Sequence, residues 1–286
     1  MSPVRPHFME HPGPVSEQRI VALPSAIRSV SGPCGESGQS LAKAISVFST
    51  QHGIKSAVGT IRNCGLSKTR FTTGGPARDG RAANYTWIRE FGPTYVSEAV
   101  FTLGVDLDGE PFVHCHAVMD GDEIPLRSGG HLFPNDCLLD SNFGVELHGL
   151  VDVELTQQPD AETLHSVFEP NIAGDNPIPE SYFIRLRPNL DVTEALEKAC
   201  SDLRISNATI LPSIGSLNAP LLRGNNSDIQ FDDVGMEVMR FSGEVRGGRA
   251  IVQAMICNGA GELFKGELAP GQAPICVTAE LLLRVD

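Results

Sequence analysis

The sequence has little positive charge, no long hydrophobic run and no run of Lys or Arg. Its 286 residues include 22 basic and 35 acidic side chains, which give a net charge of −13. Because nucleic acids and anionic lipids attract positively charged surfaces, this balance opposes non-specific binding to either. No stretch approaches the roughly 18 apolar residues that a membrane-spanning helix needs. We therefore expect neither a nucleic-acid partner nor a membrane partner.

The seven cysteines lie far apart, and no two of them form a Cys-x-x-Cys pair. Scattered cysteines of this kind are typical of small buried residues in a reducing compartment. Residues 1–21 contain no apolar segment of the length that a signal peptide needs. Hydrophobic residues make up 41% of the chain, which is enough for a globular core. These features predict a soluble, cytoplasmic protein.

What the sequence does contain is an internal repeat. Residues 41–66 align without a gap with residues 192–217. In both segments apolar residues at helical spacing are followed by a short break and a β-branched run that ends near a glycine. The pattern predicts a helix, a strand and a turn, and it occurs in both segments.

The later parts of the two copies also align, residues 98–118 with residues 237–257. Each predicts a strand, a tight turn and a second strand. The turns contain Asp108-Gly109 and Gly247-Gly248, and such pairs suit two-residue hairpins because both positions can take positive φ. Two copies of one domain, at residues 26–150 and 180–286, are the simplest interpretation.

Three segments lie outside this pattern. Residues 1–25 form an N-terminal extension. Residues 151–179 are rich in Pro, Asn, Asp and Glu and predict a linker laid over the surface. The first copy also carries an insertion, residues 72–96, with the only Trp, two of the three Tyr and three Arg of the chain. Insertions of this length are usually functional loops or mobile ones, so this one either lines a pocket or moves freely.

Three histidines stand out in the first copy. His114 and His116 are separated by one residue in an apolar strand, so their side chains share one face, roughly 6.6 Å apart along the strand. His131 follows Gly129-Gly130, where a backbone without side chains can bring its ring back toward the pair. Three imidazoles that converge could hold one divalent metal ion, most favourably zinc. The alternative is that all three are ordinary hydrogen-bonded histidines.

The second copy serves as an internal control for this site. It has Gln253, Met255 and Glu267 at the positions of His114, His116 and His131, while the surrounding apolar pattern persists. The fold therefore does not require the histidines, which favours a shared function for them. We expect the second copy to lack the site.

A carboxylate at the start of the first hairpin, Glu98, aligns with Glu237. If Asp108-Gly109 is a two-residue turn, Phe101 lies opposite His116 and Glu98 points away from the histidine face. Because both copies keep this Glu, we expect it to have a structural, hydrogen-bonded role.

The repeat resembles a known family on three stretches, "GIKSAVGTIRNCGL", the "DGEPFVHCHAV" hairpin and "GGHLFPNDC". They resemble the PPC domain, the plants and prokaryotes conserved domain, which in plants is joined to AT-hooks. The resemblance covers residues 26–150 and, more weakly, 180–286, as in a tandem bacterial version. It implies an α+β fold in which each of two similar domains is an antiparallel-rich sheet flanked by helices.

The same resemblance implies a homo-oligomer, a trimer or another pseudo-symmetric ring. Prokaryotic members often have the HxH and GGH pattern, which maps here onto His114, His116 and His131 and implies a metal site. No AT-hook core, Arg-Gly-Arg-Pro, occurs in this chain, so the plant role in DNA binding transfers poorly.

Our leading hypothesis is a cytoplasmic metal-binding protein that acts as a small-molecule hydrolase or lyase on a polar substrate, with an anionic one as a candidate. Arg81 and Arg78 in the insertion are candidate carboxylate clamps, and Tyr85 is a candidate proton donor. A second hypothesis is a DNA-associated or metabolite- or metal-sensing regulatory protein without catalysis. A third is a purely structural oligomer whose histidines belong to the core.

Overall fold

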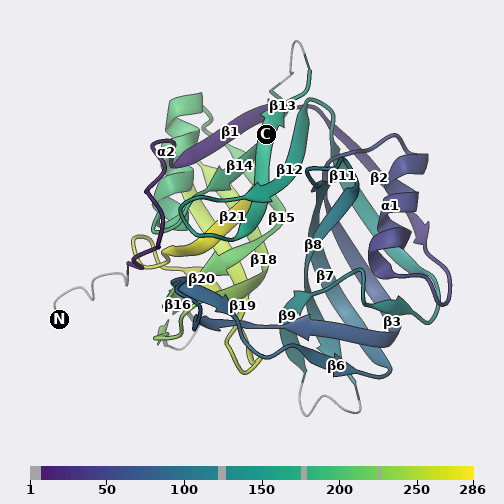
Figure 1. The fold of residues 1–286 in the computed structure, drawn as a ribbon. Helices are drawn as coiled ribbons and strands as arrows, with labels where there is room; N and C mark the ends of the chain where they lie inside the picture. Colours follow the sequence, from purple (N-terminus) through teal and green to yellow (C-terminus); the bar gives the residue numbers. More distant parts are fainter. Residues whose placement is uncertain (1–7, 122–126, 175–178, 225–226) are drawn as a thin grey trace.

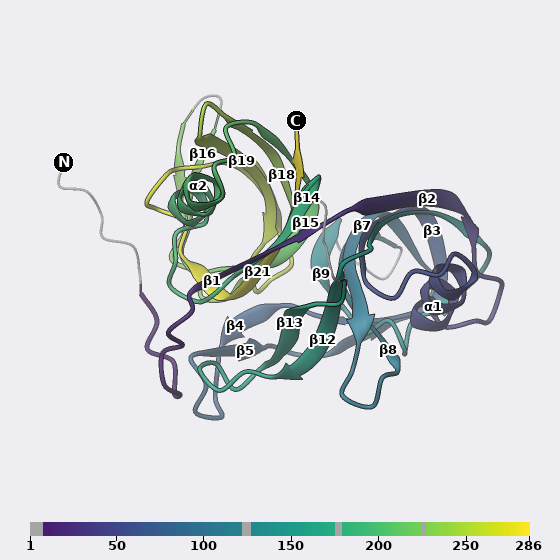
Figure 2. The ribbon, with the colours of Figure 1, turned by 90° about the horizontal axis from the view of Figure 1, so that it is seen from above.

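A computed structural model describes residues 8–121, 127–174, 179–224 and 227–286. The chain forms two large antiparallel sheets, each curled around its own core and accompanied by one helix (Figures 1 and 2). Neither helix of the described residues has the length and apolar character that would let it cross a bilayer.

The first sheet has ten strands, and a small two-stranded sheet lies beside it. The bounds of the strands and the helix in this part of the chain are β2 (Ile27–Cys34), α1 (Leu41–Gln51), β3 (Ala57–Thr72), β4 (Gly74–Pro76), β5 (Ala83–Tyr85), β6 (Arg89–Phe91), β7 (Thr94–Val105), β8 (Pro111–Asp120), β9 (Ser128–Leu132), β10 (Leu138–Leu139), β11 (Phe143–Leu150), β12 (Val153–Pro159) and β13 (Ser166–Ile172). Because β9 pairs with both β8 and the far end of β3, part of this sheet closes on itself.

The second sheet has nine strands. The bounds are β1 (Ile20–Ser25), β14 (Ser181–Leu186), α2 (Val192–Leu203), β15 (Ala208–Leu217), β16 (Leu221–Arg223), β17 (Ile229–Gln230), β18 (Met236–Arg246), β19 (Arg249–Cys257), β20 (Leu263–Leu268) and β21 (Ile275–Val285).

The two sheets share one strand order. The first runs β2-β11-β3-β7-β8-β9 along part of its pairing, and the second runs β14-β21-β15-β18-β19-β20. In both, the helix follows the first of these strands in the chain. The common order agrees with the internal repeat of the sequence, while the boundaries of the two domains stay a prediction.

The helices form where the sequence supplies caps and an apolar face. Ser40 accepts a hydrogen bond from the backbone N–H of Lys43 at the start of α1, and Asp191 does the same for Glu194 at the start of α2. Ile45 is among the α1 residues buried against the first sheet. The predicted antiparallel sheets are present, but helices contribute less than predicted, because a single helix accompanies each sheet within the described residues.

The predicted linker is not an irregular connection. Its described part forms the hairpin β12–β13, which joins β7 through a parallel bridge between Thr156 and Val105. The predicted N-terminal extension contributes β1, which pairs with β14 of the second sheet and continues almost directly into β2 of the first (Figure 2). Residues 1–7 of that extension and residues 175–178 of the linker lie outside the described residues.

An apolar layer joins the two sheets. It contains buried side chains from both halves of the chain, namely Val58, Val100, Leu150, Val153, Leu155 and Phe168 from the first and Phe183, Leu211, Ile214 and Leu282 from the second. A smaller cluster places Val118 of β8 against Met239 and Cys257. The face of β7 and β8 that carries Val100 and Val118 is therefore turned toward the second sheet.

The register of the β7–β8 hairpin differs from the sequence prediction. His116 lies opposite Val100, whereas Phe101 lies opposite Cys115. The turn is longer than two residues, because the Asp106 carboxylate accepts the backbone N–H groups of Asp108 and Glu110 and so stabilises a wider loop. The second hairpin does have the predicted two-residue turn, with Gly247 and Gly248 at positive φ.

Candidate metal centre

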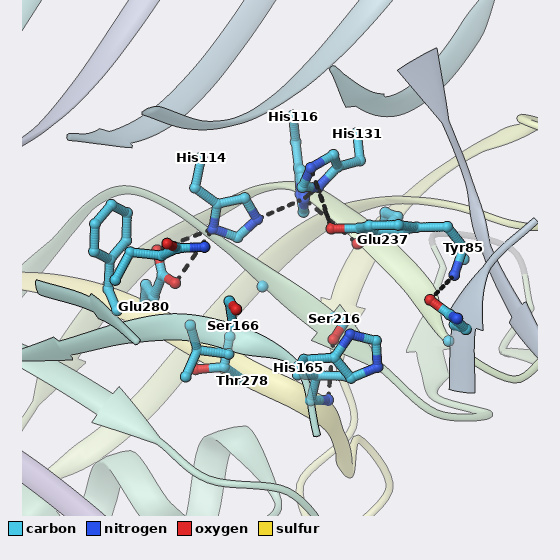
Figure 3. A pocket seen from close by; sticks show the side chains of 18 of the residues that line it. Tyr85, His114, His116, His131, His165, Ser166, Ser216, Glu237, Thr278 and Glu280 are labelled. Atoms are coloured by element: carbon cyan, nitrogen blue, oxygen red, sulfur yellow. Dashed lines mark hydrogen bonds and ion pairs between the residues drawn. The ribbon is translucent and has the colours of Figure 1, made fainter. Parts of the chain in front are cut away.

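Three histidine side chains meet on the face of the first sheet that is turned toward the second (Figure 3). His114 and His116 come from β8, and His131 lies directly opposite His116 on the neighbouring strand β9. His114 Nε2 is 3.1 Å from His116 Nε2, and His116 Nε2 is 3.2 Å from His131 Nδ1. One nitrogen from each ring lies within 4.8 Å of the others. We call these residues the histidine trio.

Two members of the trio are held in a defined tautomer by the second sheet. His116 Nδ1 lies 2.8 Å from the carbonyl oxygen of Val238, and His114 Nδ1 lies 3.2 Å from a carboxylate oxygen of Glu280. Because both partners accept hydrogen bonds, each Nδ1 carries the proton. In the neutral rings the two Nε2 lone pairs then face each other at 3.1 Å, and that contact is repulsive unless a proton or a cation lies between them.

The spacing of these nitrogens suits a metal ion. Zinc bound tetrahedrally at about 2.0–2.1 Å holds its nitrogen ligands about 3.3–3.4 Å apart. Two of the three nitrogen–nitrogen separations in the trio, 3.1 and 3.2 Å, are close to this value, and the third is within 4.8 Å. The contacts of Val238 and Glu280 to the outer nitrogens are the kind that commonly orient metal-binding histidines. The residues present therefore fit a divalent metal.

Burial and mutual repulsion keep two of the rings neutral. Burial, together with the nearby His114, lowers the pKa of His116 to about 3. The same causes, with His116 added, hold the pKa of His131 well below its usual value. Burial also lowers the pKa of His114, but the Glu280 and Glu237 carboxylates together outweigh it and the net shift is upward. Neutral imidazoles are the form that binds metals.

The second sheet contributes two buried carboxylates to the site. Glu280 on β21 is 1% exposed and Glu237 on β18 is 6% exposed. Glu237 Oε2 lies 3.4 Å from His116 Nε2, and burial raises the pKa of this carboxyl to about 7 although His114 opposes the shift. Neither residue was assigned to the site from the sequence. The only available signal was the alignment of Glu237 with Glu98, which does not show which faces of the two copies meet.

Glu98 itself shares the histidine face, so the prediction that it points away is wrong. The longer hairpin loop shifts the register by one residue and places Glu98 opposite Val118. Its carboxylate is 2.5 Å from Arg240 Nη1 of the second sheet. This ion pair across the two sheets agrees with the structural role expected for Glu98.

A cavity of about 470 Å³ opens beside the trio, between the two sheets. The insertion at residues 72–96 reaches it and contributes Gly74, Arg81, Ala83, Asn84 and Tyr85 to its lining. The Tyr85 hydroxyl lies 3.2 Å from His131 Nε2, on the side away from His114 (Figure 3). The structure thus brings the predicted residues Tyr85 and Arg81 to the cavity, and their catalytic roles stay a prediction.

The two candidate carboxylate clamps differ in position. The Arg81 side chain lines the cavity, but its Nε is 3.5 Å from Asp79 and its Nη1 is 3.4 Å from the Asn84 side chain. The guanidinium of Arg78 lies over the Trp87 ring, 5.7 Å from its centroid, and Arg78 is absent from the cavity lining. Arg78 is therefore not placed to hold a ligand in this cavity.

The side chains at the equivalent positions of the second copy make different contacts. Gln253 contacts Glu267 at 3.5 Å, and Met255 packs against the small apolar cluster formed by Val118, Met239 and Cys257. Within the described residues the trio is the one group of His, Cys, Asp and Glu side chains arranged to hold a metal ion.

Comparison with known proteins finds a family model that matches part of the chain. Residues 175–285 match the family model of the Plants and Prokaryotes Conserved (PCC) domain. No curated protein is significantly similar to the chain.

Three solved structures are similar over about half of this chain. A metal-containing protein from Archaeoglobus fulgidus has 18% identity and a TM-score of 0.39, and the match covers 51% of this chain and 96% of that one. A plant- and prokaryote-conserved protein from Pyrococcus horikoshii has 21% identity, a TM-score of 0.39 and coverage of 51% and 94%. A protein from Ralstonia eutropha that is named as a candidate DNA-binding protein has 16% identity, a TM-score of 0.37 and coverage of 53% and 95%.

Proposed function

We propose that this protein, whose residues 175–285 match the family model of the Plants and Prokaryotes Conserved domain, binds one divalent metal ion, most favourably zinc, through His114, His116 and His131. The observation that carries the proposal is the pair of Nε2 atoms 3.1 Å apart. The Nδ1 atoms of the same two rings already donate to the Val238 carbonyl and the Glu280 carboxylate. A cation between the two Nε2 atoms therefore relieves the repulsion of their lone pairs.

We also propose that the adjoining cavity binds a small polar molecule, on which the protein acts as a hydrolase or lyase. A divalent ion held by three neutral histidines, when bound, can polarise a carbonyl oxygen and lower the pKa of water. The chain supplies the remaining functions. Glu280 orients His114, and the Val238 carbonyl orients His116.

Two further side chains are placed to move protons. Glu237 Oε2 lies beside the trio and can accept a proton from a group bound next to His116 Nε2. The Tyr85 hydroxyl, beside His131 Nε2, can donate one to a leaving group in the cavity. The apolar layer between the sheets limits the entry of water to the cavity side, which strengthens the electrostatic contacts of the trio.

Metal analysis tests the first proposal. Protein purified without an affinity tag and supplied with zinc should contain about one zinc per chain. His116→Ala should lose the metal while its circular dichroism spectrum stays unchanged. His148→Ala is the matched control, because His148 contacts Ser29 and Glu146 away from the trio and should keep the metal.

Two results would oppose the proposal. One is a wild-type chain that takes up no divalent metal, and the other is a His116→Ala chain that binds as much as the control. If metal is bound, turnover of ester, amide and hydroxy-acid libraries by the loaded protein tests the hydrolase or lyase assignment. A cytoplasmic homo-oligomer, a trimer or a pseudo-symmetric ring, stays part of the proposal, and light scattering on the eluting protein measures its mass.

A further inference from the structure

The wall of the cavity across from the histidine trio carries hydroxyl groups. Ser166, Ser216 and Thr278 lie there (Figure 3). Ser216 Oγ accepts the backbone N–H of Val277 at 3.1 Å, which fixes the oxygen in place and leaves the hydroxyl hydrogen out of that bond. Thr278 is 4% exposed, and its Oγ1 has no hydrogen-bond partner within the described residues. A buried hydroxyl without a partner is uncommon in folded proteins and points to a missing one.

The fourth polar group on this wall is neutral. His165 Nε2 lies 2.9 Å from the carbonyl oxygen of Ala83, so it carries the proton and donates to that oxygen. Burial lowers the pKa of His165, and the Arg81 guanidinium adds to the effect. The wall therefore offers hydroxyls, which both donate and accept hydrogen bonds, and a neutral imidazole whose Nδ1 is left as an acceptor.

Charged groups in the lining are already balanced. Arg81 pairs with Asp79, and Asp136 pairs with Arg70 at 2.8 Å. The remaining lining charges are Glu237 and Glu280, both beside the trio. If the trio holds a divalent cation, as proposed above, these two carboxylates balance it. An anionic ligand would then meet no unpaired cation among the described lining residues, and it would face two carboxylates.

Aromatic side chains complete the lining. Tyr85 and Phe133 lie edge to face with centroids 6.1 Å apart, and Phe168 lines the same cavity. Flat ring faces of this kind pack against the apolar face of a sugar or against a base. The volume of about 470 Å³ falls within the range of roughly 300–1,000 Å³ that small-molecule sites have.

From these contacts we infer that the cavity binds a neutral ring compound with several hydroxyl groups, a sugar or a nucleoside, rather than the anionic substrate considered from the sequence. Its hydroxyls bond to Ser216 and Thr278, and its ring packs on Tyr85. The inference rests on the proposed function, because the bound metal supplies the positive charge that the two carboxylates balance.

Matched pairs of probes test the charge preference. Methyl glucoside and methyl glucuronide differ by one carboxylate, and uridine differs from uridine monophosphate by a phosphate. Binding to the zinc-loaded protein is followed by saturation-transfer NMR and titration. At least one neutral probe should bind tenfold more tightly than its anionic partner, and the pair that does so separates a sugar from a nucleoside.

Two variants test the hydroxyl wall. Thr278→Val and Ser216→Ala should weaken binding of the neutral probe about threefold to tenfold, the range of one lost hydrogen bond, with zinc content unchanged. Thr209→Val is the control, since its hydroxyl contacts Asp286 at the surface. Three results would each overturn the inference without affecting the proposed metal site. They are equal or tighter binding of the anionic probes, unchanged probe binding in both variants, and zinc-loaded protein that binds no probe. A chain without metal would overturn the proposed function itself.

Discussion

Replacing Glu280 by Gln is the sharpest test of the site, because it leaves the three histidines untouched. Glu280 lies on the second sheet and contacts His114 Nδ1 through both carboxylate oxygens, at 3.2 and 3.3 Å. It is 1% exposed, so its charge acts on His114 with little screening by bulk water. Gln has nearly the same shape and still offers one oxygen to the Nδ1 proton. The substitution therefore removes the negative charge and keeps the packing.

The magnitude follows from the role of the charge. A carboxylate behind a metal-binding histidine makes the ring a stronger ligand, and losing such a partner typically weakens metal binding 10- to 100-fold. Because Gln keeps a neutral hydrogen bond, we expect the lower end, about tenfold or about 1.4 kcal/mol. The other two ligands and their contacts should be unaffected.

Competition with a chromophoric zinc chelator measures this change in affinity. Glu146→Gln is the matched control, because Glu146 is an exposed carboxylate 3.7 Å from a histidine outside the trio. Its affinity should equal that of the wild type. If Glu280→Gln and Glu146→Gln both bind zinc as the wild type does, then the second sheet does not tune the trio, and our reasoning about the tautomer of His114 fails.

Three other outcomes follow from the same geometry. The net shift raises the pKa of His114 above its usual 6.5, so a proton competes with the metal for this ring. Zinc affinity measured at a series of pH values should therefore already fall as the pH drops toward 6.5. A constant affinity down to pH 5 would contradict this. Ile214→Ala, at a fully buried position between the sheets, should lower the free energy of unfolding by about 2–5 kcal/mol in urea denaturation, whereas Ile251→Ala, at a 40% exposed position, should change it by less than about 0.5 kcal/mol. Tyr85→Phe should keep about one zinc per chain by elemental analysis and lower turnover of any substrate that the loaded protein accepts, and unchanged turnover would remove Tyr85 as the proton donor.

The strand alternation of the first copy made the candidate trio visible in the sequence. His114 and His116 share a face because successive side chains of a strand alternate, and this holds wherever the strand lies in the fold. The glycines before His131 leave room for other parts of the fold: a Cβ at Gly129 would meet Cys257 and Leu263 of the second sheet, and one at Gly130 would meet Phe71 of β3. Pairing of β9 with β8 places His131 opposite His116.

The register of the β7–β8 hairpin was harder to predict from the sequence, because it depended on one side chain. The Asp106 carboxylate stabilises a wider loop than the Asp-Gly pair suggests, and a shift of one residue turns Glu98 to the opposite face. The hairpin within the predicted linker was hard to foresee for a related reason. Its polar composition resembles a loop, but pairing of β12 with β13 satisfies its backbone in a hairpin.

The sequence by itself determined the repeat, the helix-strand-turn and hairpin patterns that both copies share, and the three aligned positions at which only the first copy has histidine. Only the tertiary structure decided what faces them. His114 and Glu280 are 166 residues apart, and their contact depends on how the two sheets pack. Side-chain periodicity is a local property of the backbone, whereas the partner of a buried face is chosen by the shape and chemistry of the whole interface.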